Sequence, residues 1–579
     1  MSFLSVESSL TGRRWVGPPI EVERAAEAIA QHSGLPAAVA QILARRQVPP
    51  LEAEGFLSPS LRELLPDPQA LKDMEKAAAR LLSGLKKRER IAIFADYDVD
   101  GGSSAALLLI WLRHMGHGAT LYVPDRIDEG YGPNEEAMAQ LAADHDLIIC
   151  VDCGTLSHGP IAAAKGADVL VLDHHLGAET LPDALAVVNP NRQDETGDLA
   201  HLCAAGVVFL LLVELGRQLR GAETSGPDLM GMLDLVALAT VADVAPLIGV
   251  NRAFVRQGLR VMARRERPGL AALADVARMD TAPTAYHLGF LLGPRVNAGG
   301  RIGAADLGAR LLATEDPHEA AALAERLDVL NTERREIEAS VRAAALDQAE
   351  TRGLDSALVW AAGPRWHPGV VGIVASRLKD ASGRPSIVIG LEDGIGKGSG
   401  RSISGVDLGQ PIQRLAAEGL LLKGGGHKMA AGLTVAEDKL EAAMARLTEL
   451  LEKQGAHLAG AADLKLDGLL MPAAATVELT EMVEQAGPFG ASAPAPRYVF
   501  ADMAIRFAKR VGESHLKLSF GDAGGTTMEA ICFGAFDGPL GPALENQGGK
   551  HFHLAGRLDI NTWRGRKSVQ LRLEDAAPS

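Results

Sequence analysis

Three acidic segments of the sequence carry side chains of the types that can bind metal ions. They are Asp96–Gly101 (DYDVDG), the aspartate Asp152, and Asp173–His175 (DHH), and each directly follows a short apolar run. Carboxylate and imidazole groups together are ligands of Mn²⁺ and Mg²⁺. Zn²⁺ is less favoured because no thiolate needs to take part. The residue types therefore predict divalent-cation chemistry, provided that the three segments meet in the fold.

The apolar runs that precede these segments predict a buried parallel sheet. Each run is apolar on both faces and is separated from the next by a helical crossover. Because the carboxyl ends of parallel strands lie along one edge, where ligands bind, we expect the carboxylates and imidazoles to converge there. So many like charges repel strongly unless cations neutralise them. The predicted strands are Ile91–Ala95, Leu147–Val151, Val169–Leu172 and Leu185–Val188.

Each acidic segment, taken alone, allows a second interpretation. The segment 96–101 could be a calcium loop, but the Glu expected later in such a loop is missing. Asp152 could equally cap a helix, and two adjacent histidines are a weak signal. The local sequence does not single out Asp243, which follows an apolar helical stretch. Cys150 and Cys153 have the spacing of a zinc site, yet Cys150 lies inside an apolar run and no second pair exists.

A long helix is predicted at 316–352, beyond the sheet. Asp316 suits the N-cap, Pro317 the first helical position, and Glu319 the third position of a capping box. Gly353 suits the end of the helix. At about 1.5 Å per residue the helix would be roughly 55 Å long, so we interpret it as a spacer between two lobes.

The remaining pattern predicts four further parts. Residues 1–65 are a helical leader interrupted by prolines, and residues 66–315 contain the predicted sheet. Residues 353–460 form a second α/β lobe, and residues 461–579 form a small β-barrel or sandwich with Gly-rich turns. The strands expected in these last two parts are Ala357–Ala361, Pro385–Gly390, Leu516–Phe520, His551–Leu558 and Ser568–Leu573.

Composition limits the class of protein. With 579 residues, 47% of them hydrophobic, and a net charge of −15, the chain can bury a large core but cannot coat a polyanion with its whole surface. A local basic groove is still possible, since residues 497–575 carry a small positive net charge. Four cysteines exclude a disulfide scaffold and favour a reducing cytoplasm. The apolar run near Cys203–Val213 is shorter than the roughly 20 residues that span a bilayer, so no membrane association is expected.

Nine ordered motifs resemble the DHH phosphoesterase superfamily and, within it, the RecJ family of single-strand-specific DNA exonucleases. Each motif is short, but nine in order, from about residue 66 to 575, are specific. The resemblance implies an α/β fold, in which a long helix joins a parallel-sheet DHH domain to an α/β DHH-associated domain, and a C-terminal OB-fold β-barrel follows. The motifs are Asp96–Gly101, Pro124–Gly132, Asp152–Gly154, Asp173–His175, Ala242–Leu247, Arg295–Gly303, Trp366–Gly372, Ser399–Ser404 and Gly424–His427.

The resemblance also implies a role for individual residues around two divalent ions, Mn²⁺ or Mg²⁺. Asp152 would bridge the ions, and His175 would face the scissile phosphate. The implied catalytic residues are Asp98, Asp100, Asp152 and His175. The implied metal ligands are Asp96, Asp98, Asp100, Asp152, His174 and Asp243.

A second implied set of residues would hold the DNA. The backbone of a Gly-rich turn at 424–426 can approach a phosphate closely, and arginine adds a bidentate fork. The implied substrate-binding residues are Arg126, Tyr131, Arg295, Asn297, Arg301, Ser399, Arg401, Gly424, Gly425, Gly426 and His427. Aromatic residues of the tail that could stack on bases, at most two of them doing so, are Phe500, Phe507, Phe520, Phe552 and Trp563.

The function implied by the resemblance is hydrolysis of single-stranded DNA from 5′ to 3′, giving mononucleotides, in DNA recombination and repair. Single-strand-binding protein and a RecQ-type helicase are the implied partners, besides the DNA itself. One alternative is a phosphodiesterase acting on short oligonucleotides or cyclic dinucleotides. Another is a DNA-binding relative without catalysis, although such a relative would be expected to have lost ligands, and here every ligand position is filled.

Overall fold

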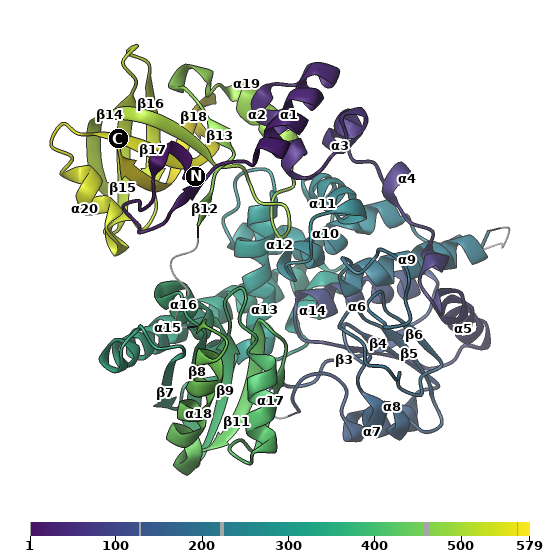
Figure 1. Ribbon diagram of the computed structural model, residues 1–579. Coiled ribbons are helices and arrows are strands. Elements are labelled where there is room, and N and C mark those ends of the chain that lie inside the picture. The colour runs from purple at the N-terminus through teal and green to yellow at the C-terminus, as the bar shows by residue number, and fades with distance from the viewer. Residues whose placement is uncertain (1, 127–128, 221–224, 457–462, 564) are drawn as a thin grey trace. The chain divides into compact units, whose positions relative to one another are not determined.

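The chain forms two compact units. Residues 64–459 make the larger unit, and residues 1–63 combine with residues 460–579 in the smaller one. Among the described residues, no helix combines the length and apolarity needed to cross a membrane. The structure is a computed structural model (Figure 1), and it describes residues 2–126, 129–220, 225–456, 463–563 and 565–579.

The larger unit contains a five-stranded parallel sheet in the order β3-β2-β4-β5-β6. The predicted parallel sheet is therefore confirmed, with strand bounds that differ by at most one residue. The sequence did not predict the edge strand β3. Its residues are mostly half-buried, and Thr120 interrupts the apolar pattern. The strands are β2 (Ile91–Ala95), β3 (Ala119–Tyr122), β4 (Leu147–Val151), β5 (Asp168–Leu172) and β6 (Ala186–Val188).

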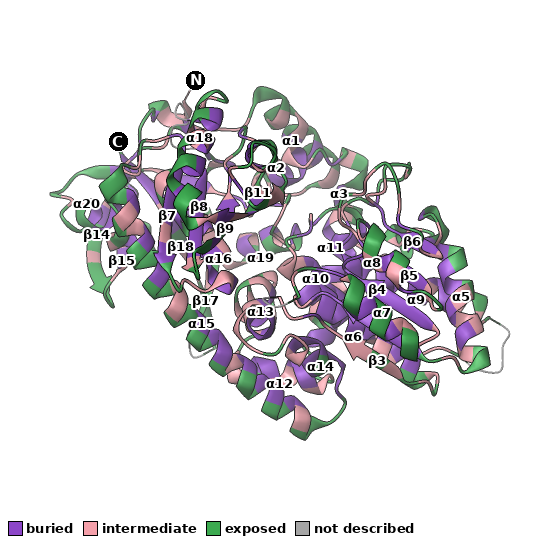
Figure 2. Ribbon diagram, turned by 90° about the horizontal axis from the view of Figure 1, so that it is seen from below, coloured by how far each residue is buried: buried purple, intermediate pink, exposed green. Residues whose placement is uncertain are grey.

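The order of the strands reverses at β2, because β3 lies on one side of it and β4 on the other. Such a reversal opens a crevice at the carboxyl ends of the two central strands. Helices α7 and α8 cover one face of the sheet with apolar side chains, as Figure 2 shows in front of β4. The helices of this part are α5 (Met74–Lys87), α6 (Val99–His114), α7 (Glu135–Asp144), α8 (His158–Ala163), α9 (Ala204–Gln218) and α10 (Leu233–Ala242).

A group of helices leads from the sheet to the long helix α15 (Pro317–Arg352). The predicted N-cap is present, since the Asp316 carboxylate accepts a hydrogen bond from the His318 amide at 2.8 Å. The predicted capping box is wrong: Glu319 instead accepts from Thr314 Oγ1 at 2.6 Å and from Arg310 at 3.0 Å. The preceding helices are α11 (Gly249–Met262), α12 (Pro268–Val276), the π-helix η5 (His287–Leu292), α13 (Gly293–Ile302) and α14 (Leu307–Ala313).

The second lobe of the larger unit has a mixed sheet in the order β10-β11-β9-β8-β7. Only β7 and β8 pair in parallel. The two predicted strands overlap β7 and β8, whereas the hairpin-connected strands that follow were not predicted. The elements are β7 (Val359–Pro364), α16 (Pro368–Ser382), β8 (Ser386–Glu392), β9 (Ile395–Arg401), α17 (Gly409–Ala417), β10 (Lys423–Gly426), β11 (Ala430–Ala436) and α18 (Leu440–Glu452).

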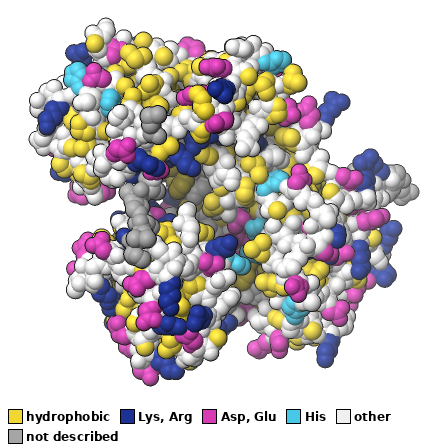
Figure 3. All heavy atoms as spheres, in the orientation of Figure 1, with side chains coloured by type: hydrophobic (Ala, Val, Ile, Leu, Met, Phe, Trp, Pro, Cys, Tyr) yellow, Lys and Arg dark blue, Asp and Glu magenta, His cyan; other side chains and the backbone are white. Residues whose placement is uncertain are grey.

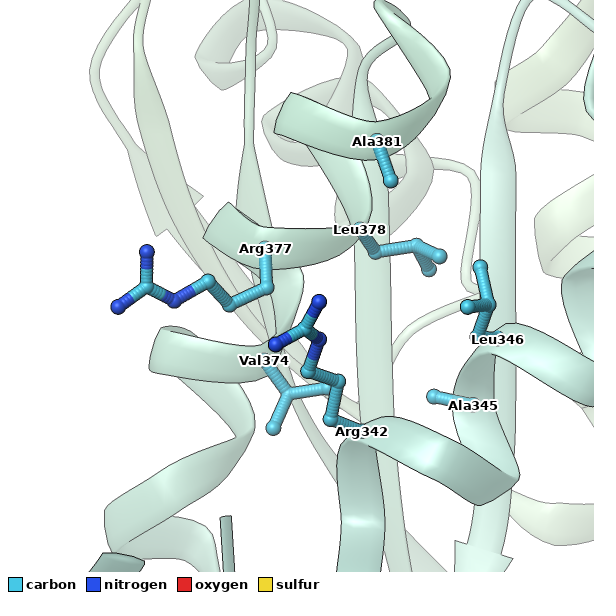
Figure 4. Close-up of a pocket in the computed structure, with 7 residues that line it drawn as sticks. All are labelled: Arg342, Ala345, Leu346, Val374, Arg377, Leu378 and Ala381. Carbon is cyan, nitrogen blue, oxygen red and sulfur yellow. The ribbon is translucent and has the colours of Figure 1, made fainter. Parts of the chain in front are cut away.

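Helix α15 is anchored to this lobe through α16. Ala345 of α15 and Val374 and Leu378 of α16 belong to one buried apolar cluster. A small pocket between the two helices, drawn in Figure 4, is lined by apolar side chains and by Arg342 and Arg377. Its lining contains no carboxylate or imidazole, so it is not the metal site that the sequence predicts.

The smaller unit contains a closed five-stranded barrel. Antiparallel pairs join β14 to β15, β15 to β16 and β17 to β18, a parallel pair joins β16 to β18, and β14 closes the barrel by pairing with β17. The predicted β-barrel is thus confirmed. Its strands are β14 (Tyr498–Val511), β15 (His515–Gly521), β16 (Thr527–Cys532), β17 (His551–Trp563) and β18 (Arg566–Pro578), with the short helix α20 (Leu540–Glu545) before β17.

Most of the barrel aromatics form its core. Phe500, Phe520 and Phe552 are buried. Phe507 is 54% exposed, and the side chain of Trp563 lies outside the described residues. A residue that the sequence did not single out, Phe533, is 55% exposed. Its ring contacts His515 edge-on and lies 5.2 Å from the Arg572 guanidinium.

The N-terminal leader folds onto this barrel unit. Strand β1 (Trp15–Val16) pairs in parallel with β12 (Leu464–Lys465), and the Trp15 ring donates a hydrogen bond from Nε1 to the buried Asp575 carboxylate at 2.9 Å. The other elements are β13 (Gly468–Leu469), which pairs with β14, and α1 (Ile20–Ser33), α2 (Ala37–Arg45), α3 (Ala53–Leu57), α4 (Leu61–Leu64) and α19 (Val477–Gln485).

We expect the substitution Trp15→Phe to destabilise the smaller unit. It removes a donor to a fully buried carboxylate, which costs about 1–3 kcal/mol of unfolding free energy. Native-state hydrogen exchange of the β18 amides, measured by mass spectrometry, should report the loss. The control is Arg14→Ala, which removes an exposed ion pair with Asp463 and should leave the protection of β18 unchanged. Equal protection of β18 in the wild type and Trp15→Phe would contradict this anchoring role.

Candidate metal and phosphate site

The first acidic segment is shaped by the start of helix α6. Asp98 is its N-cap, and its Oδ1 accepts hydrogen bonds from the amides of Asp100 at 2.8 Å and Gly101 at 3.1 Å. Gly101 is required because a Cβ there would overlap the backbone of Asp96. The turn therefore holds three carboxylates close together at the end of β2.

The amino end of α9 holds Asp100 in place. Its two carboxylate oxygens accept hydrogen bonds from the amides of Ala204 at 2.7 Å and Ala205 at 2.8 Å. Asp100 is buried, and the positive end of the α9 dipole together with the two amide donors stabilises its carboxylate there. This contact joins the end of β2 to a helix more than one hundred residues later.

His174 lies at the centre of the acidic side chains. Its Nε2 lies 3.3 Å from Asp152 Oδ1, 3.6 Å from Asp100 Oδ2 and 3.7 Å from Asp243 Oδ2. Asp243 comes from the carboxyl end of α10, and Asp152 follows β4 in a left-handed backbone conformation with φ of 59°. The predicted ligands of the three strand ends are therefore brought together, and Asp243 joins them.

The arrangement fits divalent cations because buried polar atoms face one another without a partner. Asp96 Oδ1, Asp152 Oδ1 and His174 Nε2 are buried and accept or donate no hydrogen bond. Such atoms are costly unless an ion or water satisfies them. The side chains form three overlapping sets with ligand atoms within 4.8 Å, and Asp152 belongs to two of them. The sets are Asp96, Asp98 and Asp152; Asp152, His174 and His175; and Asp100, His174 and Asp243.

Burial and mutual repulsion penalise the ionised carboxylates. Burial, followed by the charge of Asp98, raises the pKa of Asp96 well above its usual value, and burial likewise raises the pKa of Asp100 and Asp152. Burial and then the charge of Asp100 raise the pKa of Asp243 to about 8. A cation would favour the ionised forms and reverse these shifts.

His175, which shares one of these ligand sets with Asp152 and His174, is held by Asp173. Its Nδ1 lies 2.8 Å from Asp173 Oδ1, which also accepts from the backbone amides of His174 and His175. Burial lowers the pKa of His175, but the hydrogen bond and charge of Asp173 outweigh it and raise the pKa to about 9. Tyr131 Oη lies 3.1 Å from His175 Nε2 and donates to the Asp152 carbonyl. Asp173 thus orients the His175 ring, a role that the sequence did not assign.

A cluster of basic side chains is also held within the larger unit. Burial and the nearby charge of Arg126 lower the pKa of Arg301 to about 10. The same two causes lower the pKa of Arg401 and of His367. Like charges that depress one another's pKa are stabilised by an anion such as phosphate. His367 was not predicted as a site residue, although it lies within the Trp366–Gly372 motif.

Two helices bring this basic cluster together. Arg301, at the end of α13, donates from Nη1 to the Gly369 carbonyl in α16 at 3.0 Å. Arg401 donates to Ser399 Oγ at 3.0 Å, and both side chains approach α16 where Gly372 has no side chain. These contacts link the sheet-bearing part of the larger unit to its second lobe.

The Gly424–Gly426 segment is not the predicted turn but the edge strand β10, paired with β11. A Cβ at Gly426 would overlap the backbone of Ala430, whereas nothing lies within 4 Å of the Cβ position of Gly425. Glycine is therefore required for pairing at one position, and the backbone is open at the other. His427 forms the connection to β11, donating from its amide to the Ala430 carbonyl at 2.8 Å.

Arg295 and Asn297 of α13 are both engaged within the protein. Arg295 donates to Asp328 of α15 at 2.8 Å and to the Leu291 carbonyl at 2.7 Å. Asn297 Oδ1 accepts from the Val99 amide at 3.0 Å, inside the first acidic segment. Both residues thus position α13 against its neighbours.

Figure 3 shows acidic and basic side chains interspersed on each unit, so the basic cluster is a local feature.

Three family models match successive parts of the chain. The DHH family N-terminal domain matches residues 90–240, the DHHA1 domain matches residues 355–453, and the RecJ OB domain matches residues 466–575. The first two ranges contain the parallel sheet and the mixed sheet, and the third covers the barrel except for the last three residues of β18.

The chain is also similar over almost its whole length to curated proteins. The single-stranded-DNA-specific exonuclease RecJ of Dickeya dadantii is 40% identical, with 94% of this chain and 96% of that protein covered. The protein of the same name from Escherichia coli is 38% identical, with 90% and 93% covered.

Two crystal structures of RecJ from Thermus thermophilus share the fold. RecJ in complex with Mn²⁺ superimposes with a TM-score of 0.81 at 29% identity, covering 97% of this chain and 79% of that one. RecJ in complex with Mg²⁺ has a TM-score of 0.75 at 28% identity, with 97% and 78% covered.

We expect Asp173→Asn to lower the pKa of His175 from about 9 towards its ordinary value of about 6.5 in the metal-free protein. The raised pKa stabilises the folded protein below about pH 6.5, and this contribution is lost as the pH rises through about 9. An NMR titration of the imidazole measures the pKa in both proteins. The control Glu179→Gln changes an exposed carboxylate. An unchanged pKa in Asp173→Asn would contradict the role of Asp173.

Proposed function

Because the chain belongs to the RecJ family of single-stranded-DNA-specific exonucleases, we propose that it is a metal-dependent exonuclease that hydrolyses the phosphodiester bonds of single-stranded DNA. The proposal includes digestion from 5′ to 3′ to mononucleotides, in DNA recombination and repair. The observation that carries it is the set of buried, unpartnered ligand atoms of Asp96, Asp152 and His174.

The acidic cluster is proposed to hold two divalent cations, Mn²⁺ or Mg²⁺. Asp152 and His174 each belong to two of the three ligand sets, but only a carboxylate, with its two oxygens, can serve two cations at once, which supports the assignment of Asp152 as the bridging ligand. The catalytic residues in the proposal are Asp98, Asp100, Asp152 and His175. The metal ligands in the proposal are Asp96, Asp98, Asp100, Asp152, His174 and Asp243.

The protein's own residues would divide the remaining work of hydrolysis. The two cations, when bound, would lower the pKa of an attacking water and stabilise the charge that develops on the phosphate. Asp98 and Asp100 hold their carboxylates through the turn before α6 and the amino end of α9, so they need no reorganisation on binding. His175, whose Nδ1 is held by Asp173, would donate a hydrogen bond from its ring to a phosphate oxygen.

The basic cluster is proposed to grip the phosphate of the DNA end. Arg126, Arg301 and Arg401 supply planar guanidinium forks, and Ser399 adds a hydroxyl beside Arg401. The open backbone at Gly425 suits a close approach by the DNA. The other residues assigned to this grip are Tyr131, Gly424, Gly426 and His427, while Arg295 and Asn297 act by positioning α13.

The barrel unit is proposed to bind the single strand further along. Phe507 and Phe533 are exposed aromatic rings, and exposed aromatics on an OB-fold stack on bases without regard to sequence. Residues 66–315 would then be catalytic, 353–460 would grip the end, and the helix 316–352 would join them. Residues 461–579 would hold the strand with the leader 1–65 folded onto them. A matching OB model disfavours a phosphodiesterase limited to dinucleotides.

The proposal also covers the partners of the protein and its location in the cell. Single-strand-binding protein and a RecQ-type helicase would present the DNA, since the enzyme needs unpaired strands. We also propose a cytoplasmic location, because a reducing compartment suits the four free cysteines.

Digestion of end-labelled DNA tests the function and the bridging carboxylate together. The wild type should degrade single-stranded but not double-stranded DNA with Mn²⁺ or Mg²⁺, and a chelator should stop it. Asp152→Asn should reduce cleavage by at least about a thousandfold, because shared charge stabilisation is worth several kcal/mol. Its binding to single strands, measured by fluorescence anisotropy, should persist. Normal turnover by Asp152→Asn would rule out the bridging role, and activity in chelator would rule out metal dependence.

A second substitution tests the phosphate grip. Arg401→Ala should raise KM for single strands by about 10- to 100-fold, since charge-assisted hydrogen bonds contribute about 1.5–3 kcal/mol. It should also shrink the difference between 5′-phosphorylated and 5′-hydroxyl ends. The matched control is Arg414→Ala in the same lobe, where an exposed arginine pairs with Glu418. If both variants keep the wild-type KM and end preference, Arg401 does not hold the phosphate.

A further inference from the structure

Two aromatic rings are stacked on the surface of the larger unit just before α13. Tyr286 is 55% exposed and Phe290 is 72% exposed. Their ring centroids lie 5.2 Å apart with an interplanar angle of 24°. Leu288 and Leu292 of the same π-helix η5 are fully buried, so the helix has a separate core-facing side. The stacked pair is therefore not part of the core.

The helix that carries this pair leads directly to the proposed metal site. Gly289 and Gly293 pack against Val241 and Ala242, the last residues of α10 before Asp243. Glycine at position 293 allows this close packing, since a Cβ there would lie only 3.2 Å from the Ala242 side chain. Phe290 thus lies three residues before Gly293, which packs against the segment that supplies a proposed metal ligand.

Further along, the same helix reaches the first acidic segment and the phosphate grip. Asn297 accepts a hydrogen bond from the Val99 amide, a Cβ at Gly300 would lie 2.6 Å from the Tyr97 ring, and Arg301 contacts Gly369. From Phe290 to Asn297 the rise along the helix is about 10 Å. A stacked single strand rises about 3.4 Å per nucleotide, so the same span corresponds to about three nucleotides.

We propose that Tyr286 and Phe290 form a stacking platform for bases of the single strand, a few nucleotides from the scissile phosphate. This inference rests on the proposed function and adds to it a base-binding site outside the barrel. Each base presents a flat π-face, which an exposed aromatic ring binds regardless of sequence. Nearly parallel rings present such a face on the outer side of the pair.

The position favours nucleic acid over a protein partner. The platform is continuous, through η5 and α13, with residues proposed to hold the phosphate and the cations. A strand whose end is gripped near Arg301 must leave the site past some surface of the larger unit. Val244, which follows Asp243, is also exposed on this path, in a left-handed conformation with φ of 60° that is rare for a β-branched residue.

The test compares the full-length wild type with the double variant Tyr286→Ala/Phe290→Ala on two substrates. Binding of a 5′-phosphorylated strand of about 20 nucleotides, in chelator, should weaken about 10- to 100-fold in the double variant. Cleavage of a dinucleotide, which is too short to reach the platform, should keep its kcat/KM. A strand carrying 2-aminopurine at the third or fourth nucleotide should lose fluorescence on binding the wild type but not the double variant. The matched control Tyr286→Phe/Phe290→Tyr retains both rings and should behave as the wild type.

The outcomes separate the platform from the function on which it rests. Unchanged long-strand affinity with normal dinucleotide cleavage would overturn the platform and leave the exonuclease assignment standing. An equal loss of affinity for the long strand and of kcat/KM for the dinucleotide would show a general structural effect and would also overturn the platform. A change of oligomeric state on size-exclusion chromatography, with DNA affinity unchanged, would assign the aromatic pair to contact between two copies instead. A wild type that cleaves neither substrate would refute the proposed function itself.

Discussion

Mutual repulsion among buried carboxylates is the constraint that organises the larger unit. Asp96 and Asp152 offer ligand atoms within 4.8 Å of each other at the ends of neighbouring strands, and burial makes these two carboxylates and that of Asp100 costly to ionise. The fold offsets part of that cost with amide donors at the start of α6 and α9. The rest must come from cations. The amino end of α9, the turn before α6 and the position of His174 can all be understood as responses to this one problem.

A second charge problem of opposite sign lies in the same unit. The charge of Arg126 lowers the pKa of Arg301 and of Arg401, and no carboxylate pairs with any of the three among the described residues. One substrate can relieve both problems, since a phosphodiester is an anion that ligates metal ions. The contact between Arg301 and Gly369 ties the two halves of this arrangement together. In the proposed function, catalysis and substrate binding would therefore draw on two opposite charge imbalances within one unit.

The sequence predicted the strands β2, β4 and β5 and the acidic residues after them, because continuous apolar runs and adjacent charges are local signals. It predicted α15 from its cap and stop residues for the same reason. Features that depend on distant contacts were not accessible. Only the resemblance to a family identified Asp243, and nothing local showed that His367 would join the arginines. The glycines at 424–426 resembled a turn, since strand pairing at an edge leaves no hydrophobic pattern.

The pairing of the leader with the barrel has a consequence for synthesis of the chain. Trp15 emerges early from the ribosome, but its partner Asp575 lies in the last strand. At about 5–20 residues per second, the first segment waits roughly half a minute to two minutes for that strand. The larger unit, encoded between the two pieces, can complete its own fold meanwhile. A ribosome that stalls late would therefore leave a finished larger unit with an unpaired N-terminal segment, a target for chaperones or proteases.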